Sequence, residues 1–103
     1  MFIHSVYFWL RDDLAPAERQ RFEDGIRSLA AIDTVERGYI GKPAPTDREV
    51  IERGYSHALI LTFADQRAHD AYQLHPVHDR FREQCAGYWS GIRIFDTITN
   101  DAG

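Results

Sequence analysis

Apolar and aromatic side chains fill both faces of the extended segment formed by residues 2 to 11. One face carries His4, Val6, Phe8 and Leu10, and the other carries Ile3, Ser5, Tyr7 and Trp9. β-branched and aromatic residues in this pattern are typical of a strand that is covered on both sides. The chain is therefore predicted to begin with a strand inside a layered structure.

A helix is predicted after this strand. Residues 12 to 15 lead into Pro16, a residue that suits the first turn of a helix. An apolar stripe then recurs at helical spacing, formed by Phe22, Ile26, Leu29 and Ala30. The charged residues between them are expected to face solvent.

Three more strands and a pair of helices are predicted in the rest of the chain. Strands are expected over residues 35–41, 56–63 and 91–99, and the proline-containing polar loop 43–49 is expected to connect two of them. Asp65 is expected to cap a helix that ends near Leu74, since the residue before a proline avoids helical geometry. Pro76 then begins a second helix with His75 as its cap.

This order, βαββαβ, predicts one α+β domain over residues 1–103 with a ferredoxin-like, four-stranded antiparallel sheet and helices on one face. The other face of the sheet would carry Tyr7, Trp9, Ala58, Ile60 and Phe95. An apolar patch of this kind is typical of an interface. We therefore expect a homodimer with two-fold symmetry, in which the two sheets face each other in a dimeric α+β barrel.

Composition and charge narrow the classes of partner. The chain is 44% hydrophobic and 27% charged, with a net charge of -4 and no basic block, so neither nucleic acid nor an anionic membrane is an expected partner. No apolar run approaches the roughly 20 residues of a transmembrane helix. The single cysteine, Cys85, cannot form an intrachain disulfide, which favours a reducing, cytoplasmic location, and we expect it to be a small core residue.

The stretch from Tyr72 to His78 holds a phenol and two imidazoles around a proline and is the main candidate site. His78 would be the third residue of the helix that begins at Pro76. The helix dipole and apolar surroundings both disfavour a positive charge there, so His78 would be a neutral base near pH 7. Tyr72, across the corner, would polarise a carbonyl or stabilise an enolate. The alternatives are a histidine with only local hydrogen bonds and a core tyrosine.

The other histidines carry weaker signals. By strand parity His4 and His57 project toward the helices, each as a ligand-binding residue or as a hydrogen-bonded core histidine, whereas His69 is expected at the surface. No His-Glu-x-x-His helix or carboxylate at metalloenzyme spacing is present, so no metal site is predicted. No Gly-rich phosphate loop and no Gly-x-Ser-x-Gly elbow is present, so nucleotide binding and serine hydrolysis are not expected, and no cofactor is predicted.

Four motifs together resemble one family. They are His4-x-Val6-x-Phe8-x-Leu10, Gly-Tyr-Ser-His-Ala-Leu at 54–59, Tyr-Gln-Leu-His-Pro-Val-His at 72–78, and the end from Trp89 to Phe95-Asp96. The chain is similar over nearly its whole length to the stress-responsive A/B barrel (Dabb) proteins, which are dimeric α+β barrels.

The resemblance also implies chemistry, because plant polyketide cyclases of this family share the Tyr-x-x-His-Pro-x-His arrangement. It implies a cofactor-free aldol cyclisation with His78 as base and Tyr72 as hydrogen-bond donor, on a small apolar or aromatic carbonyl compound. The pocket would lie between sheet and helices, lined by His4 and walled by Phe22, Ile26, Leu59, Leu61, Ile92 and Ile94. The alternative is a non-catalytic homodimer that binds a metabolite or acts in a stress response.

Overall fold

The computed structural model describes residues 1–100. Its elements are β1 (Phe2–Leu10), α1 (Pro16–Ala30), β2 (Arg37–Gly41), β3 (His57–Phe63), α2 (Gln66–Gln73), α3 (Pro76–Cys85), the short 3-10 helix η1 (Ala86–Tyr88) and β4 (Trp89–Ile98). The predicted βαββαβ order is confirmed, although β2 begins two residues later than expected and β4 two residues earlier. Within this part of the chain no helix combines the length and hydropathy needed to cross a membrane.

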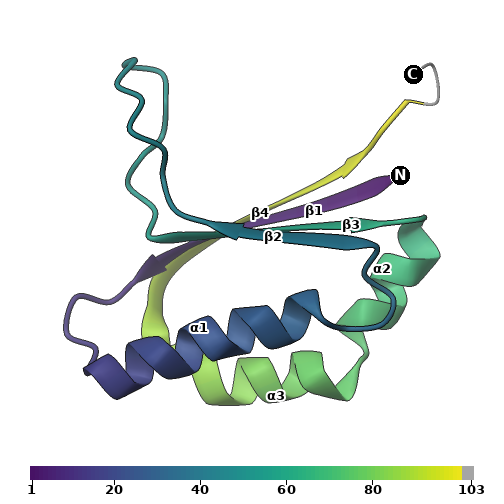
Figure 1. The fold of residues 1–103 in the computed structure, drawn as a ribbon, viewed down its shortest axis with the longest axis horizontal. Coiled ribbons are helices and arrows are strands. Elements are labelled where there is room, and N and C mark those ends of the chain that lie inside the picture. Colours follow the sequence, from purple (N-terminus) through teal and green to yellow (C-terminus); the bar gives the residue numbers. More distant parts are fainter. Residues whose placement is uncertain (101–103) are drawn as a thin grey trace.

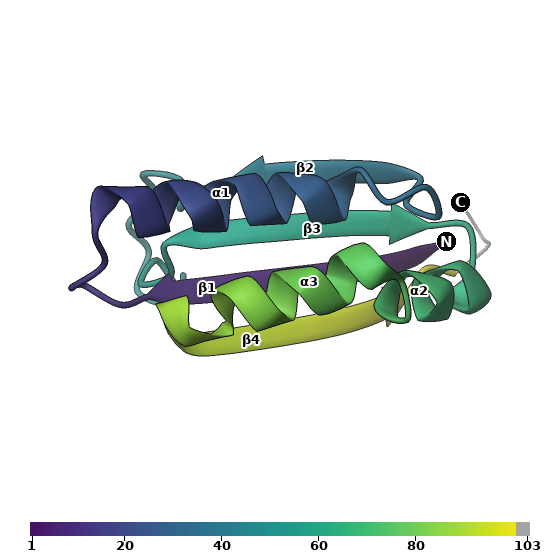
Figure 2. The ribbon, with the colours of Figure 1, turned by 90° about the horizontal axis from the view of Figure 1, so that it is seen from below.

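The four strands form an antiparallel sheet in the order β2-β3-β1-β4. All three α-helices lie on one face of this sheet (Figure 1). Seen from the helical side, α1 lies over β2 and β3, and α3 lies over β1 and β4 (Figure 2). The predicted ferredoxin-like arrangement, with helices on one face only, is confirmed.

Burial alternates along β1 within the single chain, because the helices cover only one face of the sheet (Figure 1). The residues facing the helices are buried, and those facing the other way are partly exposed. Phe8 packs edge-to-face against Phe22 of α1, with ring centroids 5.0 Å apart, and β3 contributes Leu59 and Leu61 to the same layer. Burying each such side chain contributes roughly 1.5–3 kcal/mol, so this layer is the main source of stability.

Each helix begins at a residue that the sequence identifies. Pro16 is the first residue of α1, and the N–H of Ala15 donates to Oε1 of Glu18 at 2.8 Å. Asp65 caps α2 by accepting from the N–H of Ala68 at 2.9 Å. Nδ1 of His75 accepts from the N–H of Val77 at 3.0 Å and so caps α3, as predicted. Such caps contribute about 1 kcal/mol each, and the last one fixes the corner between α2 and α3.

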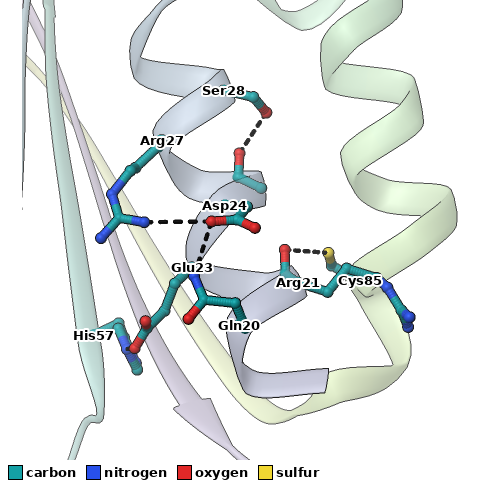
Figure 3. Close-up of polar contacts among 9 residues, drawn as sticks. Gln20, Arg21, Glu23, Asp24, Arg27, Ser28, His57 and Cys85 are labelled. Atoms are coloured by element: carbon teal, nitrogen blue, oxygen red, sulfur yellow. Dashed lines mark hydrogen bonds and ion pairs between the residues drawn. The ribbon is translucent and has the colours of Figure 1, made fainter. Parts of the chain in front are cut away.

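Helices α1 and α3 pack closely because a glycine stands between them. Cα of Gly25 carries no side chain where Phe81 and Cys85 approach, and Sγ of Cys85 lies 3.9 Å from the carbonyl oxygen of Arg21 (Figure 3). Cys85 is fully buried, and burial raises the pKa of its thiol. The expectation that Cys85 is a small core residue is confirmed.

The face of the sheet away from the helices carries aromatic side chains. Tyr7 packs edge-to-face against Tyr55 at 5.0 Å, and Phe95 is half exposed. The loop between β2 and β3 projects from this side of the sheet (Figure 1). Between loop and sheet lies a hollow of about 540 Å³ whose lining includes Trp9 and Glu52. The apolar outer face expected from the sequence is therefore present.

A side chain at Gly25 should destabilise the fold. A Cβ atom there would lie 2.8 Å from Cδ1 of Phe81, so Gly25→Val should lower the free energy of unfolding by about 1–3 kcal/mol. Because valine has a higher helix propensity than glycine, any loss of stability is due to the steric clash. Gly41→Val is the control, since no atom lies within 4 Å of its Cβ position. Urea unfolding that gives equal stabilities for the two variants would contradict the tight α1–α3 contact.

Candidate functional site

A cavity of about 490 Å³ lies between the sheet and helix α3. It is lined mainly by apolar side chains, with four polar or charged groups besides His4: Tyr72, Gln73, His78 and Arg82. The apolar lining consists of Val6, Phe8, Leu29, Leu59, Phe81, Ala86, Trp89, Ile92 and Ile94. Ile94 is 51% exposed, so the cavity is accessible over β4.

The proline corner brings Tyr72 and His78 together at this cavity. Tyr72 ends the buried face of α2 and His78 lies in the first turn of α3, so the two side chains meet across the corner. Their rings are 5.1 Å apart and packed edge-to-face. Among residues 1–100 no group hydrogen-bonds to the Tyr72 hydroxyl. The hydroxyl is therefore free to donate to a ligand.

Burial keeps both of these groups neutral. The pKa of His78 is lowered, first by burial and then by the nearby Arg82 guanidinium. The pKa of Tyr72 is raised by burial, so its hydroxyl stays protonated. Nδ1 of His78 is buried without a hydrogen-bond partner in the described part of the chain, which leaves Nε2 as the nitrogen available to a ligand. A neutral imidazole and a protonated phenol can act as base and donor.

His4 is the third polar side chain at this end of the cavity. On β1 it stands opposite Asp96 of β4, and its Nδ1 lies 2.6 Å from Oδ1 of that carboxylate. Its ring is 5.7 Å from the ring of Tyr72. Burial lowers the pKa of His4, and this effect outweighs the hydrogen bond that the imidazole donates to Asp96, which raises the pKa. His4 is thus a neutral imidazole whose orientation is fixed by Asp96.

His69 is buried, so the prediction that it lies at the surface is wrong. Only 5% of it is exposed, and its ring stacks on Phe2 with centroids 4.3 Å apart. The ring of His4 is 4.9 Å away. The error arose because α2 packs against the end of β1, a contact that the pattern of α2 does not reveal. The one signal was that His69 and Tyr72 are three residues apart and so share a helix face.

Four of the residues expected around the pocket lie elsewhere. Phe22 and Leu61 are fully buried in the core beneath α1, and Ile26 is almost so. His57 is also buried, with Nε2 3.3 Å from Oε1 of Glu23 (Figure 3). It lines a separate hollow of about 290 Å³ that Ile26 also borders. Because α1 packs directly on β3, the cavity reaches α1 only at Leu29.

Some of the residues that line the cavity were not predicted to do so from the sequence pattern. Phe81 and Arg82 enter from α3, and Trp89 enters where β4 begins. Asp96 does not line the cavity but holds His4, and it could have been found by strand parity, because it follows Ile92 and Ile94 on the same face of β4. Of the expected residues, Tyr72, His78, His4, Leu59, Ile92 and Ile94 all line the cavity.

Comparison with known proteins agrees with this fold. Olivetolic acid cyclase from Cannabis sativa is 24% identical over 94 residues, which cover 90% of this chain and 91% of that protein. A solved structure of a dimeric ferredoxin-like protein of unknown function from Thermobifida fusca gives a TM-score of 0.75 at 19% identity, covering 95% of this chain and 90% of the other. The hydroxynitrile lyase from Passiflora edulis gives 0.78 at 17% identity, covering 99% and 95%.

The family assignment rests on a match over almost the whole chain. Residues 2–99 match the family described as the stress responsive A/B barrel domain, Dabb. The resemblance noted from the four sequence motifs is thereby confirmed. The two solved structures, at below 25% identity, support the fold alone. The chain is a member of the stress-responsive A/B barrel (Dabb) domain family.

Proposed function

We propose that this protein binds a small apolar or aromatic carbonyl compound in the cavity beneath α3 and catalyses a cofactor-free proton transfer on it, of the aldol-cyclisation kind. The observation that carries the proposal is the pair of neutral groups, His78 and Tyr72, at one end of an otherwise largely apolar cavity. A volume of about 490 Å³ lies within the roughly 300–1,000 Å³ usual for small-molecule sites.

In this mechanism His78 removes a proton from a carbon next to a carbonyl group of the substrate. Its Nε2 takes the proton and the imidazole becomes an imidazolium. The resulting enolate oxygen accepts a hydrogen bond from the Tyr72 hydroxyl. The enolate carbon then attacks a second carbonyl of the same molecule and closes a ring. The new alkoxide takes its proton back from the imidazolium, which restores neutral His78.

The similarity to olivetolic acid cyclase supports a cyclisation over other carbonyl chemistry. The match includes nearly all of both chains, and the motif Tyr72 to His78 lies at the cavity here. The apolar walls favour substrates with hydrocarbon or aromatic parts. They contain no feature that selects one chain length, so the proposal is restricted to the class of substrate.

A second candidate is a metabolite-binding protein without catalysis. It is favoured by one observation: Tyr72 and His78 contact each other ring to ring and share no hydrogen bond within residues 1–100. A merely bound ligand would need the same cavity. The two functions are therefore separated by chemistry at His78 and not by binding alone.

We also propose that the chain forms a homodimer through the outer face of its sheet. That face carries aromatic side chains from β1 and β4, and Phe95 is half exposed. Apolar patches of this kind usually mark interfaces. The ferredoxin-like structure from Thermobifida fusca is described as dimeric.

Replacing either polar group of the cavity should abolish most of the activity. His78→Ala should reduce kcat/KM for ring closure of a linear poly-β-keto thioester by about 10²–10⁴-fold, since the base is lost. Tyr72→Phe should reduce it by about 10²–10³-fold through loss of the enolate donor. His75→Asn, in the same motif, keeps a capping side chain and should leave the rate unchanged. Wild-type binding of the thioester without turnover would instead support the metabolite-binding function.

From acidic to alkaline pH, the protonation of His78 should determine how the rate of the reaction depends on pH. Because burial lowers the pKa of His78 below its usual 6.5, kcat/KM should be flat at neutral pH and fall only below pH 6.5. The raised pKa of Tyr72 predicts no loss of rate near pH 10. Stability should fall in the same acidic range, because the unfolded chain binds a proton at His78 before the folded one does. A midpoint above pH 6.5 in the rate profile would argue against His78 as the base.

Dimerisation should be lost when a charge is placed on the outer face. Sedimentation velocity of the wild type should give the mass of two 11.9 kDa chains, and Phe95→Lys should shift the protein to single chains because lysine would be buried unpaired. Leu74→Lys is the control, since Leu74 is an exposed apolar residue at the corner between α2 and α3. Equal masses for the two variants would exclude the outer face as the interface.

A further inference from the structure

Three side chains capable of binding a metal ion meet at one end of the sheet. They are His4 on β1, His69 on α2 and Asp96 on β4, and one ligand atom from each lies within 4.8 Å of the others. His69 and Asp96 do not line the cavity, so this cluster extends beyond the site described above. Its members come from three elements that are distant in the sequence.

One ring nitrogen of the buried His69 has no hydrogen-bond partner in the described part of the chain. Its Nε2 is buried and has no hydrogen bond within residues 1–100, although the residue is only 5% exposed. A buried polar atom left unpaired costs about 1–3 kcal/mol, and such atoms are few in native proteins. Its other nitrogen, Nδ1, lies 3.1 Å from Oδ1 of Asp70. A histidine held at one nitrogen by a carboxylate, with the other nitrogen free, is the usual arrangement of a metal-ligating imidazole.

Aromatic rings hold the His69 imidazole in place. It stacks on Phe2 at 4.3 Å and packs edge-to-face against Phe63 at 5.5 Å. An apolar shell of this kind limits the access of water and fixes the orientation of a ligand before the ion arrives. The free nitrogen therefore belongs to a ring held in a fixed position, with its centroid 4.9 Å from that of His4.

The charges of the cluster also suit a cation. Asp96 supplies a carboxylate, and its side chain is 42% exposed. This exposed side gives an ion a path from solvent to the two buried imidazoles.

We propose that His4, His69 and Asp96 bind a divalent transition-metal ion, with zinc as the first choice. Two imidazoles and one carboxylate are a donor set that zinc accepts with water as the fourth ligand. With bonds of about 2.0–2.1 Å, ligand atoms of a tetrahedral zinc lie about 3.3 Å apart. To reach that spacing, the 2.6 Å contact between His4 and Asp96 has to widen, and no distance between ligand atoms changes by more than about 1.5 Å. The ion would take the place of the proton between His4 and Asp96.

The proposal departs from the sequence-based prediction that no metal site is present. That prediction rested on the absence of a His-Glu-x-x-His helix and of a carboxylate at metalloenzyme spacing. Neither reason applies to ligands that three separate elements bring together.

The test is zinc binding by the full chain, freed of any histidine tag and treated with a chelator. Isothermal titration with zinc chloride should show one ion per chain. His69→Gln and Asp96→Asn should each abolish that binding. Asp70→Asn should weaken it by about 10–100-fold, because it removes only the outer partner of His69. His57→Gln is the matched control, since His57 is also a buried histidine beside a carboxylate, and it should bind zinc as the wild type does.

Two results would overturn the proposal. One is the absence of zinc uptake by the wild type at micromolar concentrations, which would leave the three residues as packed neighbours without a metal. The other is unchanged uptake in the His69 and Asp96 variants, which would place the ion elsewhere. Near-ultraviolet circular dichroism checks that each variant is folded.

A measurement on the wild type alone covers the case in which a variant does not fold. Cobalt in place of zinc should give the intense visible absorption of a tetrahedral site. In nuclear magnetic resonance spectra, zinc should shift the imidazole nitrogen resonances of His4 and His69 but not those of His57. Shifts confined to other histidines would contradict the proposal. The proposed cyclisation is independent of this outcome, and its rate can be measured in the presence of chelator.

Discussion

The pairing of β1 with β3 on one side and with β4 on the other is the interaction on which the rest of this molecule depends. Side chains alternate across a sheet, so a slip of one residue in either pairing would turn every inward side chain outward. The observed register places His4 opposite both Leu61 and Asp96. It thereby sets which side chains face the core, where the cavity lies and which carboxylate reaches the buried His4.

The two long helices cover this sheet unequally, and the cavity is the result. Helix α1 packs directly on β3, so Phe22 and Leu61 fill the space between them. Helix α3 leaves the inner face of β4 partly uncovered, so Ile92 and Ile94 remain accessible. The larger cavity therefore lies on the α3 side of the helical layer, where the inner face of β4 is less completely covered.

Burial in an apolar setting has the same chemical consequence for several groups at this end of the sheet. It lowers the pKa of His78 and His4 and raises that of Tyr72, so these groups are neutral together. Neutral imidazoles serve equally as bases and as metal ligands. Burial is thus the physical cause behind both the proposed base and the proposed ion site. Asp96 hydrogen-bonds to His4 and not to His78, so the two proposed roles belong to different histidines.

The elements of the fold followed from local physics that can be read along the chain. The β-branched and aromatic composition of β1, the proline at the first turn of α1 and α3, and the caps at Asp65 and His75 act on neighbouring residues, and these elements appear in the structure as expected. The meeting of Tyr72 and His78 was also foreseeable, because only a proline corner separates them. In contrast, the burial of His69 and its approach to Asp96 depend on how α2 docks on β1 and how β4 pairs with β1. Those contacts join residues far apart in the chain, and no periodicity within one segment encodes them, so only the packed structure decided them.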